Sequence, residues 1–303
     1  MTIKHIIISG GMHKFMSAYG VIKQLHNQNI WDYENLQTIY ATSSGAFLAV
    51  LICLLYDWET LDDYIIKRPW EHFFKISPMQ FIDIFKTKGL YNMQHTKKYI
   101  TDMMKPLLNG KTLNLNITLK ELYEYSKIEL HLYTLEINEF ELCDLSYKTH
   151  PDLKVSDAVY MTGAYPIIVS PFCTEHDNKC YLDGGIIINC PLEKCLTQTK
   201  CKESEILSIK YQYIKPSPVI NDTTLSVYLN TLIYKIFDRL NINAKDIPNT
   251  IYCTTQNVVV DENNVVNEDL LTGLINTISS EEGRKLLVDT GVNDANEFIA
   301  KRC

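Results

Sequence analysis

The chain has 303 residues, of which 46% are apolar and 21% are charged, and its formal net charge is −7. These values are typical of a globular protein and exclude a disordered or low-complexity chain. The acidic balance, without a run of lysines or arginines, argues against nucleic acid as a partner. The longest apolar run, Ala46 to Tyr56, has about half of the ~20 residues that a membrane-spanning helix needs, so we expect no transmembrane segment.

The cysteines indicate a reducing compartment. There are nine, no two of them form a C-x-x-C pair, and no secretory signal opens the sequence. We therefore expect reduced thiols and a cytoplasmic location, at most peripheral to membranes. A group of five fits no zinc spacing, so we expect free thiols there and no metal or other cofactor. This group comprises Cys173, Cys180, Cys190, Cys195 and Cys201.

The first quarter of the chain alternates strands and helices. The β-branched run His5–Ile8 predicts a buried strand that ends in a glycine turn. Helical spacing of apolar residues predicts a helix from Ser17 to beyond Leu25. A second strand is expected at Thr38–Tyr40, followed by an apolar helix that ends near Tyr56.

Residues 57–125 are expected to form a mostly helical insertion or lid. Its aromatic cluster lies close to several lysines, a combination that suits contact with an anionic membrane surface. Aromatic residues at helical spacing are more often buried, so we favour a core position for them. The apolar members are Phe73, Phe74, Met79, Phe81, Ile82 and Phe85, and the lysines are Lys86, Lys88, Lys97 and Lys98.

The rest of the chain continues this alternation. Residues 128–147 show the period of two expected of strands, and a helix is expected from Ser156 to Thr162. The segment Cys180–Leu182 predicts a strand that enters the turn Asp183-Gly184-Gly185. Further helices are expected at Leu225–Leu240 and from about Ser280 to Lys301.

Short buried strands interleaved with helices predict an α/β protein with a mixed or parallel sheet between helical layers. We expect one domain over residues 1–303. Its core would comprise about 1–56 and 126–215, with the insertion at 57–125 and C-terminal helices over about 222–303. Functional groups of such folds gather where strands end.

Ser43 follows the second predicted strand and precedes a helix. The pattern G-x-S-x-G, which places a serine nucleophile on a sharp turn, is met by Ala41-Thr42-Ser43-Ser44-Gly45 with alanine for the first glycine. An ordinary loop before a helix gives the same pattern. Thr42 and Ser44 are rival hydroxyls, but only Ser43 has small residues two positions away on both sides.

The order of residues argues against a triad that uses Asp183. All eight histidines precede Asp183, whereas serine hydrolases of the α/β type run serine, acid, histidine. A triad would need another carboxylate followed by His150 or His176, and both of these are typical of surface histidines. Asp152, Asp157 and Asp177 lack the strand-to-glycine context of Asp183.

Three segments together resemble the patatin-like phospholipase family. They are the glycine loop and helix from Ser9 to Leu25, the Ser43 turn, and the stretch from Ser156 through Pro166 to Gly185. A weaker likeness extends over Ser279 to Phe298. The resemblance implies a three-layer α/β/α fold with a mostly parallel central sheet and hydrolysis of acyl esters of phospholipids or related lipids.

The resemblance also implies residue roles. Ser43 would be the nucleophile and Asp183 the general base of a dyad, through an acyl-enzyme and without a metal. The N–H groups of Gly10, Gly11 and Met12 would form the oxyanion hole. Lys14, at the family's basic position, would contact an anionic head group. The partner would be a lipid, at a membrane surface or free.

The glycine loop departs from the family pattern G-G-G-x-[KR]-G, because Met12 and Phe15 replace glycines. A side chain is costly where the backbone needs positive φ or close approach. The alternative is therefore a catalytically silent module that binds lipid or protein. A nucleotide-binding domain ranks last, because the chain has neither G-x-G-x-x-G nor G-K-[ST].

Overall fold

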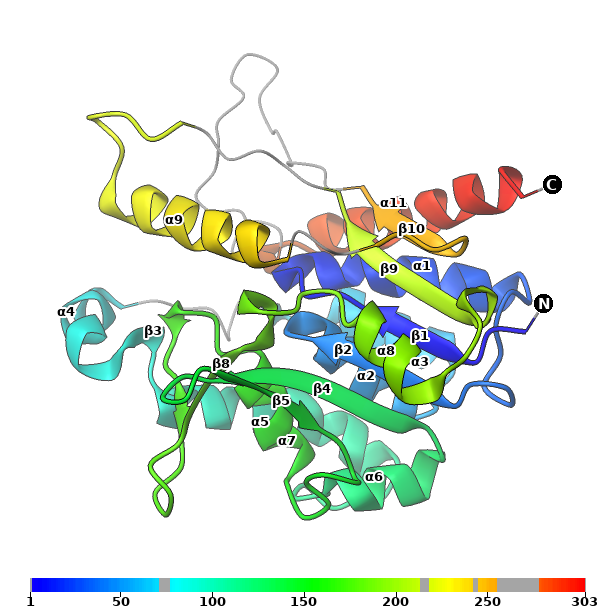
Figure 1. The fold of residues 1–303 in the computed structure, drawn as a ribbon, viewed down its shortest axis with the longest axis horizontal. Coiled ribbons are helices and arrows are strands. Elements are labelled where there is room, and N and C mark those ends of the chain that lie inside the picture. The colour runs from blue at the N-terminus through cyan, green and yellow to red at the C-terminus, as the bar shows by residue number, and fades with distance from the viewer. Residues whose placement is uncertain (1, 71–76, 213–217, 242–244, 255–277, 303) are drawn as a thin grey trace.

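The computed structural model describes residues 2–70, 77–212, 218–241, 245–254 and 278–302. In these ranges a central eight-stranded sheet lies between helices, as Figure 1 shows. The strand order is β10-β9-β1-β2-β4-β8-β7, and β5 also pairs with β4. The α/β fold with a mostly parallel sheet is therefore confirmed.

The five strands from β10 to β4 are mutually parallel. Strands β5 and β8 run antiparallel to β4, and β7 runs antiparallel to β8. A separate two-stranded parallel sheet is formed by β3 and β6. The strands are β1 His5–Ile8, β2 Thr38–Thr42, β3 Gly89–Tyr91, β4 Glu129–Glu136, β5 Glu141–Leu145, β6 Ile167–Val169, β7 Phe172–Cys173, β8 Cys180–Asp183, β9 Ile206–Tyr211 and β10 Thr250–Cys253.

Side chains of β1 alternate between two cores, as the pleat of a strand requires. Ile6 and Ile8 join the large core on one face, and Ile7 joins a smaller core on the other. Helices that pack into the large core include α1 Phe15–Asn27, α2 Ser44–Cys53, α5 Met93–Gly110, α6 Leu119–Ser126, α7 Val155–Thr162 and α11 Glu281–Ala300. Helix α8, Leu192–Thr199, covers the smaller core.

The remaining elements connect these layers. They are the 3-10 turn η1 Met12–Lys14, helix α3 Trp58–Asp62, the π-helical turn η2 Asp63–Lys67, helix α4 Pro78–Thr87, the 3-10 turns η4 Gly184–Ile186 and η5 Glu203–Glu205, and helix α9 Leu225–Leu240. No helix among the described residues combines the length and the apolar character needed to cross a bilayer.

The disulfide between Cys173 and Cys180 corrects the expectation of free thiols at these two positions. Strands β7 and β8 are antiparallel, and their register places the two cysteines directly opposite one another, with Cα atoms 4.1 Å apart. Sequence spacing alone did not reveal this pairing, because β7 is only two residues long. The thiols of Cys190, Cys195 and Cys201 are free, as expected.

The aromatic cluster of the insertion also differs from the core position that we favoured. Met79, Phe81, Ile82 and Phe85 on α4 are all more than half exposed. Ile84, on another side of α4, packs inward against a small cluster around Tyr91. The described parts of the insertion are mostly helical, apart from β3 and short connections. Phe73 and Phe74 lie outside the described residues.

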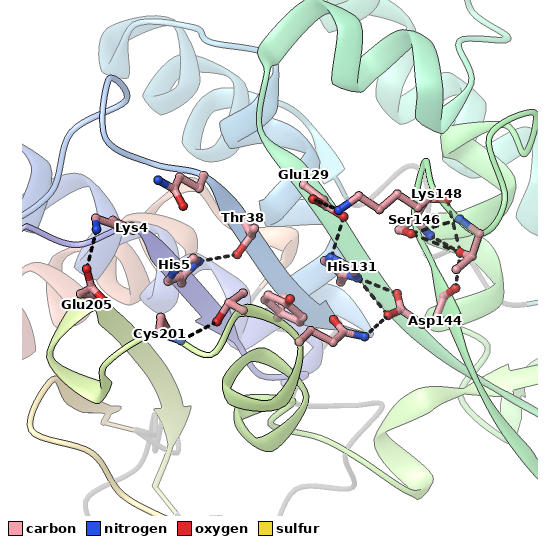
Figure 2. Close-up of a pocket in the computed structure, with 15 residues that line it drawn as sticks. Lys4, His5, Thr38, Glu129, His131, Asp144, Ser146, Lys148, Cys201 and Glu205 are labelled. Carbon is pink, nitrogen blue, oxygen red and sulfur yellow. Dashed lines mark hydrogen bonds and ion pairs between the residues drawn. The ribbon is translucent and has the colours of Figure 1, made fainter.

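A polar cavity of about 560 Å³ opens at the amino ends of the central strands (Figure 2). His131 on β4 lies between two carboxylates there. Its Nδ1 is 2.9 Å from both carboxylate oxygens of Asp144, and its Nε2 is 3.1 Å from Oε1 of Glu129. Because both ring nitrogens face acceptors, both can donate a hydrogen bond only when the ring is a protonated imidazolium. Lys148 adds an ion pair of 2.8 Å to Glu129.

We predict that His131 makes the stability of the fold depend on pH. Burial lowers the pKa of His131, but hydrogen bonds to Asp144 and Glu129 and their charges outweigh this and raise it above 6.5. The stabilisation is therefore complete below pH 6.5 and is lost as pH rises through the folded-state pKa. Replacing His131→Gln should cost roughly 3 kcal/mol at pH 6, as for other broken buried pairs, and less at pH 9.

Urea unfolding of both proteins at several pH values measures this difference. His150→Gln is a matched control, since the His150 ring bonds to the neighbouring Thr149 hydroxyl and faces no carboxylate in the described interactions. A cost at position 131 that stays constant from pH 6 to pH 9 would contradict a raised pKa of His131 in the folded protein.

Candidate active site

Ser43 occupies a sharp turn between β2 and α2. Its backbone has φ 55° and ψ −132°, a conformation that is strained for a residue with a side chain and typically costs ~1–3 kcal/mol. The Ser43 N–H donates to Oγ1 of Thr162 at 2.9 Å. Thr162 in turn donates to the carbonyl of Tyr133 on β4. Helix α7 thus ties the strained turn to the sheet.

The side chains of Ser43 and Asp183 are in direct contact. Ser43 Oγ donates to Asp183 Oδ2 at 2.6 Å, and the N–H of Gly185 donates to Asp183 Oδ1 at 2.7 Å. Strand register explains this meeting, because β4 places Tyr133 beside Thr42 and Thr134 beside Asp183. Two residues 140 positions apart therefore come together at the edge where β2 ends.

Burial sets the protonation of Asp183. The side chain is 1% exposed, and burial raises its pKa to about 6, although the hydrogen bonds from Ser43 and Gly185 lower it. No ion pair to Asp183 is recorded among the described residues. A carboxylate with this pKa is still ionised near neutral pH, and it is a stronger base than an exposed aspartate.

The rival residues have other contacts. The Thr42 hydroxyl is buried and donates to the carbonyl of Ile188 at 3.0 Å. Ser44 Oγ accepts from the N–H of Gly11 at 3.1 Å. His176 and Asp177 lie in an exposed loop, and His150 bonds to its neighbour Thr149.

The glycine loop packs tightly against Ser43. A Cβ at Gly10 would lie 2.7 Å from Ser43 Cβ and from Asn189 Oδ1, and one at Gly11 would lie 2.3 Å from the Tyr211 ring. Asn189 fixes the loop from the other side. Its Oδ1 accepts from the Gly10 N–H, and its Nδ2 donates to the Gly10 carbonyl, both at 3.1 Å.

Met12 and Phe15 differ in what they require of the backbone. Met12 has φ 52°, in the left-handed region that favours glycine, so its side chain is accommodated at the expense of strain. Phe15 has the helical values φ −55° and ψ −23°, and its ring packs edge-on against Phe47. Only the substitution at Met12 therefore strains the loop.

Met12 is the first residue of η1, which leads directly into α1. The first N–H groups of a helix have no acceptor inside it and carry partial positive charge. The Met12 N–H is therefore suited to receive an anionic oxygen. Lys14 is half-buried, burial lowers its pKa, and it does not line the pocket described next.

An apolar pocket of about 190 Å³ opens beside Ser43. Its walls include residues of η1, α1, α2, β3, α5, α7 and β6. The lining residues are Met12, His13, Phe15, Ser43, Ser44, Phe47, Tyr91, His95, Thr96, Tyr99, Ile100, Met103, Val159, Tyr160, Gly163, Tyr165, Ile168, Val169 and Ile278. The polar cavity around His131 is larger, but none of these residues lines it. The pocket beside Ser43 is small and mainly apolar, so it suits a hydrocarbon chain.

Three residues shape this site although the sequence gives them no recognisable role. His13 lines the pocket, its Nδ1 is buried without a partner, and burial together with Lys14 lowers its pKa to about 4. Thr162 holds the turn of Ser43, and Asn189 holds Gly10. The only sequence signal for Asn189 is its place just after the D-G-G element.

Comparisons with known proteins agree with the fold and the motifs. "Probable lipid hydrolase 463L" of Invertebrate iridescent virus 6 is 22% identical over 190 residues, which cover 63% of this chain and 62% of that protein. The matched part is therefore less than two thirds of that relative's length.

Solved structures show a similar fold. VipD from Legionella pneumophila has a TM-score of 0.56 and 16% identity, with 99% of this chain and 67% of VipD covered. The type III effector ExoU of Pseudomonas aeruginosa has a TM-score of 0.51 and 12% identity, with 99% of this chain and 53% of ExoU covered. The family model described as "Patatin-like phospholipase" matches residues 6–196, more than half of the chain. This chain therefore belongs to the patatin-like phospholipase family.

Proposed function

We propose that this protein is a serine lipid acyl hydrolase that cleaves fatty acyl esters of phospholipids or related lipids. The hydrogen bond of 2.6 Å from Ser43 Oγ to Asp183 Oδ2, at the wall of an apolar pocket, carries this proposal. Family membership and the name of the viral relative support the same chemistry. The substrate would be presented by a membrane or another lipid surface.

The reaction needs one proton carrier. Asp183 Oδ2 accepts the hydroxyl proton as Ser43 Oγ bonds to the ester carbonyl carbon, and it returns that proton to the departing alcohol. A water then gives its proton to Asp183 and attacks the acyl-enzyme. The fatty acid leaves, and Ser43 recovers its proton. Atoms and charge balance without a metal or other cofactor.

The glycine loop supplies the donors for the oxyanion. The Gly10 N–H is already bonded to Asn189. The main role of Gly10 is therefore that, without a side chain, it lets the loop backbone lie close to Ser43. The Gly11 N–H is bonded to the Ser44 hydroxyl, which can rotate away when a substrate oxygen arrives. We propose Gly11 and Met12 as the two donors, each typically worth ~3 kcal/mol in serine hydrolases. Lys14 would contact a head group outside the pocket.

A catalytically silent module is the second candidate. It is favoured by the positive φ of Met12 and by the protein acceptors that engage the N–H groups of Gly10 and Gly11. Such a module would keep the lipid pocket without turnover. Covalent labelling of Ser43 by a fluorophosphonate separates the two functions, because only an activated hydroxyl reacts.

We predict that Ser43→Ala and Asp183→Asn each reduce fatty acid release from phospholipid vesicles by at least 10³-fold. The first change removes the nucleophile and the second removes the base. Activated hydroxyls depend on both groups. Fatty acid release and fluorophosphonate labelling, with the labelled residue located by mass spectrometry, measure the two effects.

The matched controls are Ser204→Ala on η5 and Asp177→Asn in the exposed loop, which should retain full activity. Wild-type levels of release in either active-site variant would exclude the dyad. A wild-type protein that takes up no label and releases no fatty acid would favour the silent module.

We predict that kcat/KM rises with pH and levels off above pH 7. Burial raises the pKa of Asp183 to about 6, and only the ionised carboxylate accepts the serine proton. At pH 5 about a tenth of the molecules would be active. A soluble short-chain ester gives the profile without an interface. A rate that does not change between pH 5 and pH 8 would contradict this role.

We also predict that Asp183→Asn stabilises the protein at neutral pH. The raised pKa favours the protonated carboxyl in the folded state, so stability falls as pH rises from 3.8 through about 6. That interval corresponds to about 3 kcal/mol at 1.36 kcal/mol per pH unit, and the neutral amide avoids this cost. Urea unfolding at pH 8 should therefore show a gain of about 1–3 kcal/mol.

The same comparison at pH 5 should show a smaller gain, because Asp183 is then largely protonated. A loss of stability in the variant at pH 8 would mean that the hydrogen bonds of the carboxylate outweigh its burial.

A further inference from the structure

Helix α4 carries an apolar stripe that the described part of the protein leaves uncovered. Ile82 and Phe85 are separated by one helical turn and are 71% and 92% exposed. Met79 and Phe81 extend the same surface. Soluble monomers rarely expose such a cluster of large apolar side chains unless it contacts a partner or a membrane.

Helix α9 carries a second exposed stripe. Its members recur at intervals of three and four residues, so they lie along one side of the helix. They are Leu225, Tyr228, Leu232, Ile236 and Leu240, and each is more than 40% exposed. Both stripes belong to helices that lie at the left of Figure 1.

Both helices are anchored to the proposed lipid pocket. Ile84 of α4 packs in one cluster with Met12 and Tyr165, and both of these line the pocket. On α9, the ring centroid of Phe237 lies 5.4 Å from that of Tyr165. Asn241, which caps α9, donates to the carbonyl of Gly185 at 3.0 Å. The two helices that carry the stripes therefore lie beside the pocket at Ser43.

The charges around the stripes differ in sign from the protein as a whole. Helix α4 with its last cap carries Lys86, Lys88 and Asp83, and α9 carries Lys235, Arg239 and Asp238. Four cations and two anions give +2, whereas the whole chain has −7. The four cations are exposed. This combination of apolar stripes and cations matches the surface of an anionic bilayer.

We propose that α4 and α9 form a docking surface for an anionic lipid bilayer. This inference rests on the proposed lipid hydrolase function, to which it adds the element that brings the enzyme to its substrate. The apolar side chains enter the boundary between head groups and acyl chains, and the cations contact the lipid phosphates. The opening beside Ser43 then faces the lipids from which an acyl chain is drawn.

Flotation of the Ser43→Ala protein with vesicles tests the surface without hydrolysis. Vesicles of phosphatidylcholine with 30% phosphatidylserine should bind the protein, and pure phosphatidylcholine should bind it more weakly. We expect Ile82→Asp on α4 and Ile236→Asp on α9 each to weaken binding at least tenfold. Raising the salt concentration should weaken binding to the anionic vesicles.

Leu286→Asp on α11 is the matched control, because Leu286 is 41% exposed on a helix outside the two stripes. It should bind vesicles as the parent does. Equal binding by all three aspartate variants would overturn the docking surface. A self-associated protein that binds no vesicles, and that either stripe variant converts to a monomer, would instead show that a second copy covers the stripes.

Activity separates this inference from the proposed function. In proteins with Ser43 intact, the stripe variants should hydrolyse a soluble short-chain ester at the parental rate and vesicle lipids at least tenfold more slowly. Vesicle binding without any hydrolysis would reject the hydrolase and keep the docking surface. Equal loss on both substrates would show damage to the site and overturn the assignment.

Discussion

The hydrogen bond between Ser43 and Asp183 involves a carboxylate that is buried away from water. This carboxylate forms no ion pair with any of the described residues. A surface aspartate would be a poor base, because water stabilises its ionised form. Burial raises the pKa of Asp183, and only the Ser43 hydroxyl and the Gly185 N–H offset that effect. The balance leaves a group that is ionised near neutral pH and still holds protons more tightly than an exposed carboxylate. Much of the surrounding structure serves this balance.

Backbone strain at two positions has to be held by the rest of the fold. Ser43 and Met12 both have positive φ, and neither conformation is favourable for an isolated segment. The Thr162 hydroxyl accepts a hydrogen bond from the Ser43 N–H. The Asn189 side chain bonds to both the N–H and the carbonyl of Gly10. The Asn189 N–H donates to Asn241 at 2.6 Å, so the end of α9 supports the same loop. Residues from three distant parts of the chain therefore position one hydroxyl.

The sequence predicts the parts of this protein whose signal is local. The apolar run before Gly10 and the small residues around Ser43 identify β1 and the turn directly, because each pattern is complete within a few positions. The pairing of Ser43 with Asp183 is predicted only when the order of the histidines is combined with the family resemblance. Its physical cause, the register of β4 between β2 and β8, involves residues far apart in the chain.

Features that depend on contacts between distant segments were not predictable in this way. The disulfide of Cys173 and Cys180 requires β7, which is too short to show a period. The exposure of Phe85 depends on which side of α4 meets the body of the protein, and an amphipathic pattern does not say whether its apolar side is covered. The roles of Thr162 and Asn189 arise from side chains bonding to remote backbone groups, which leave no mark in the local sequence.

The proposed lipid pocket and the polar cavity around His131 differ in what they offer a ligand. The polar cavity around His131 has more room and lies at the opposite ends of the strands, and His131, Asp144, Glu129 and Lys148 already pair with one another there. Beside Ser43 the walls offer few polar groups, and Asp183 behind the hydroxyl is already shielded from water, with 1% of its surface exposed. An acyl chain entering the pocket would displace water from the Ser43 hydroxyl and leave the surroundings of Asp183 unchanged. The pKa of that carboxyl is thus set by the fold, through burial and the hydrogen bonds from Ser43 and Gly185, before any lipid arrives.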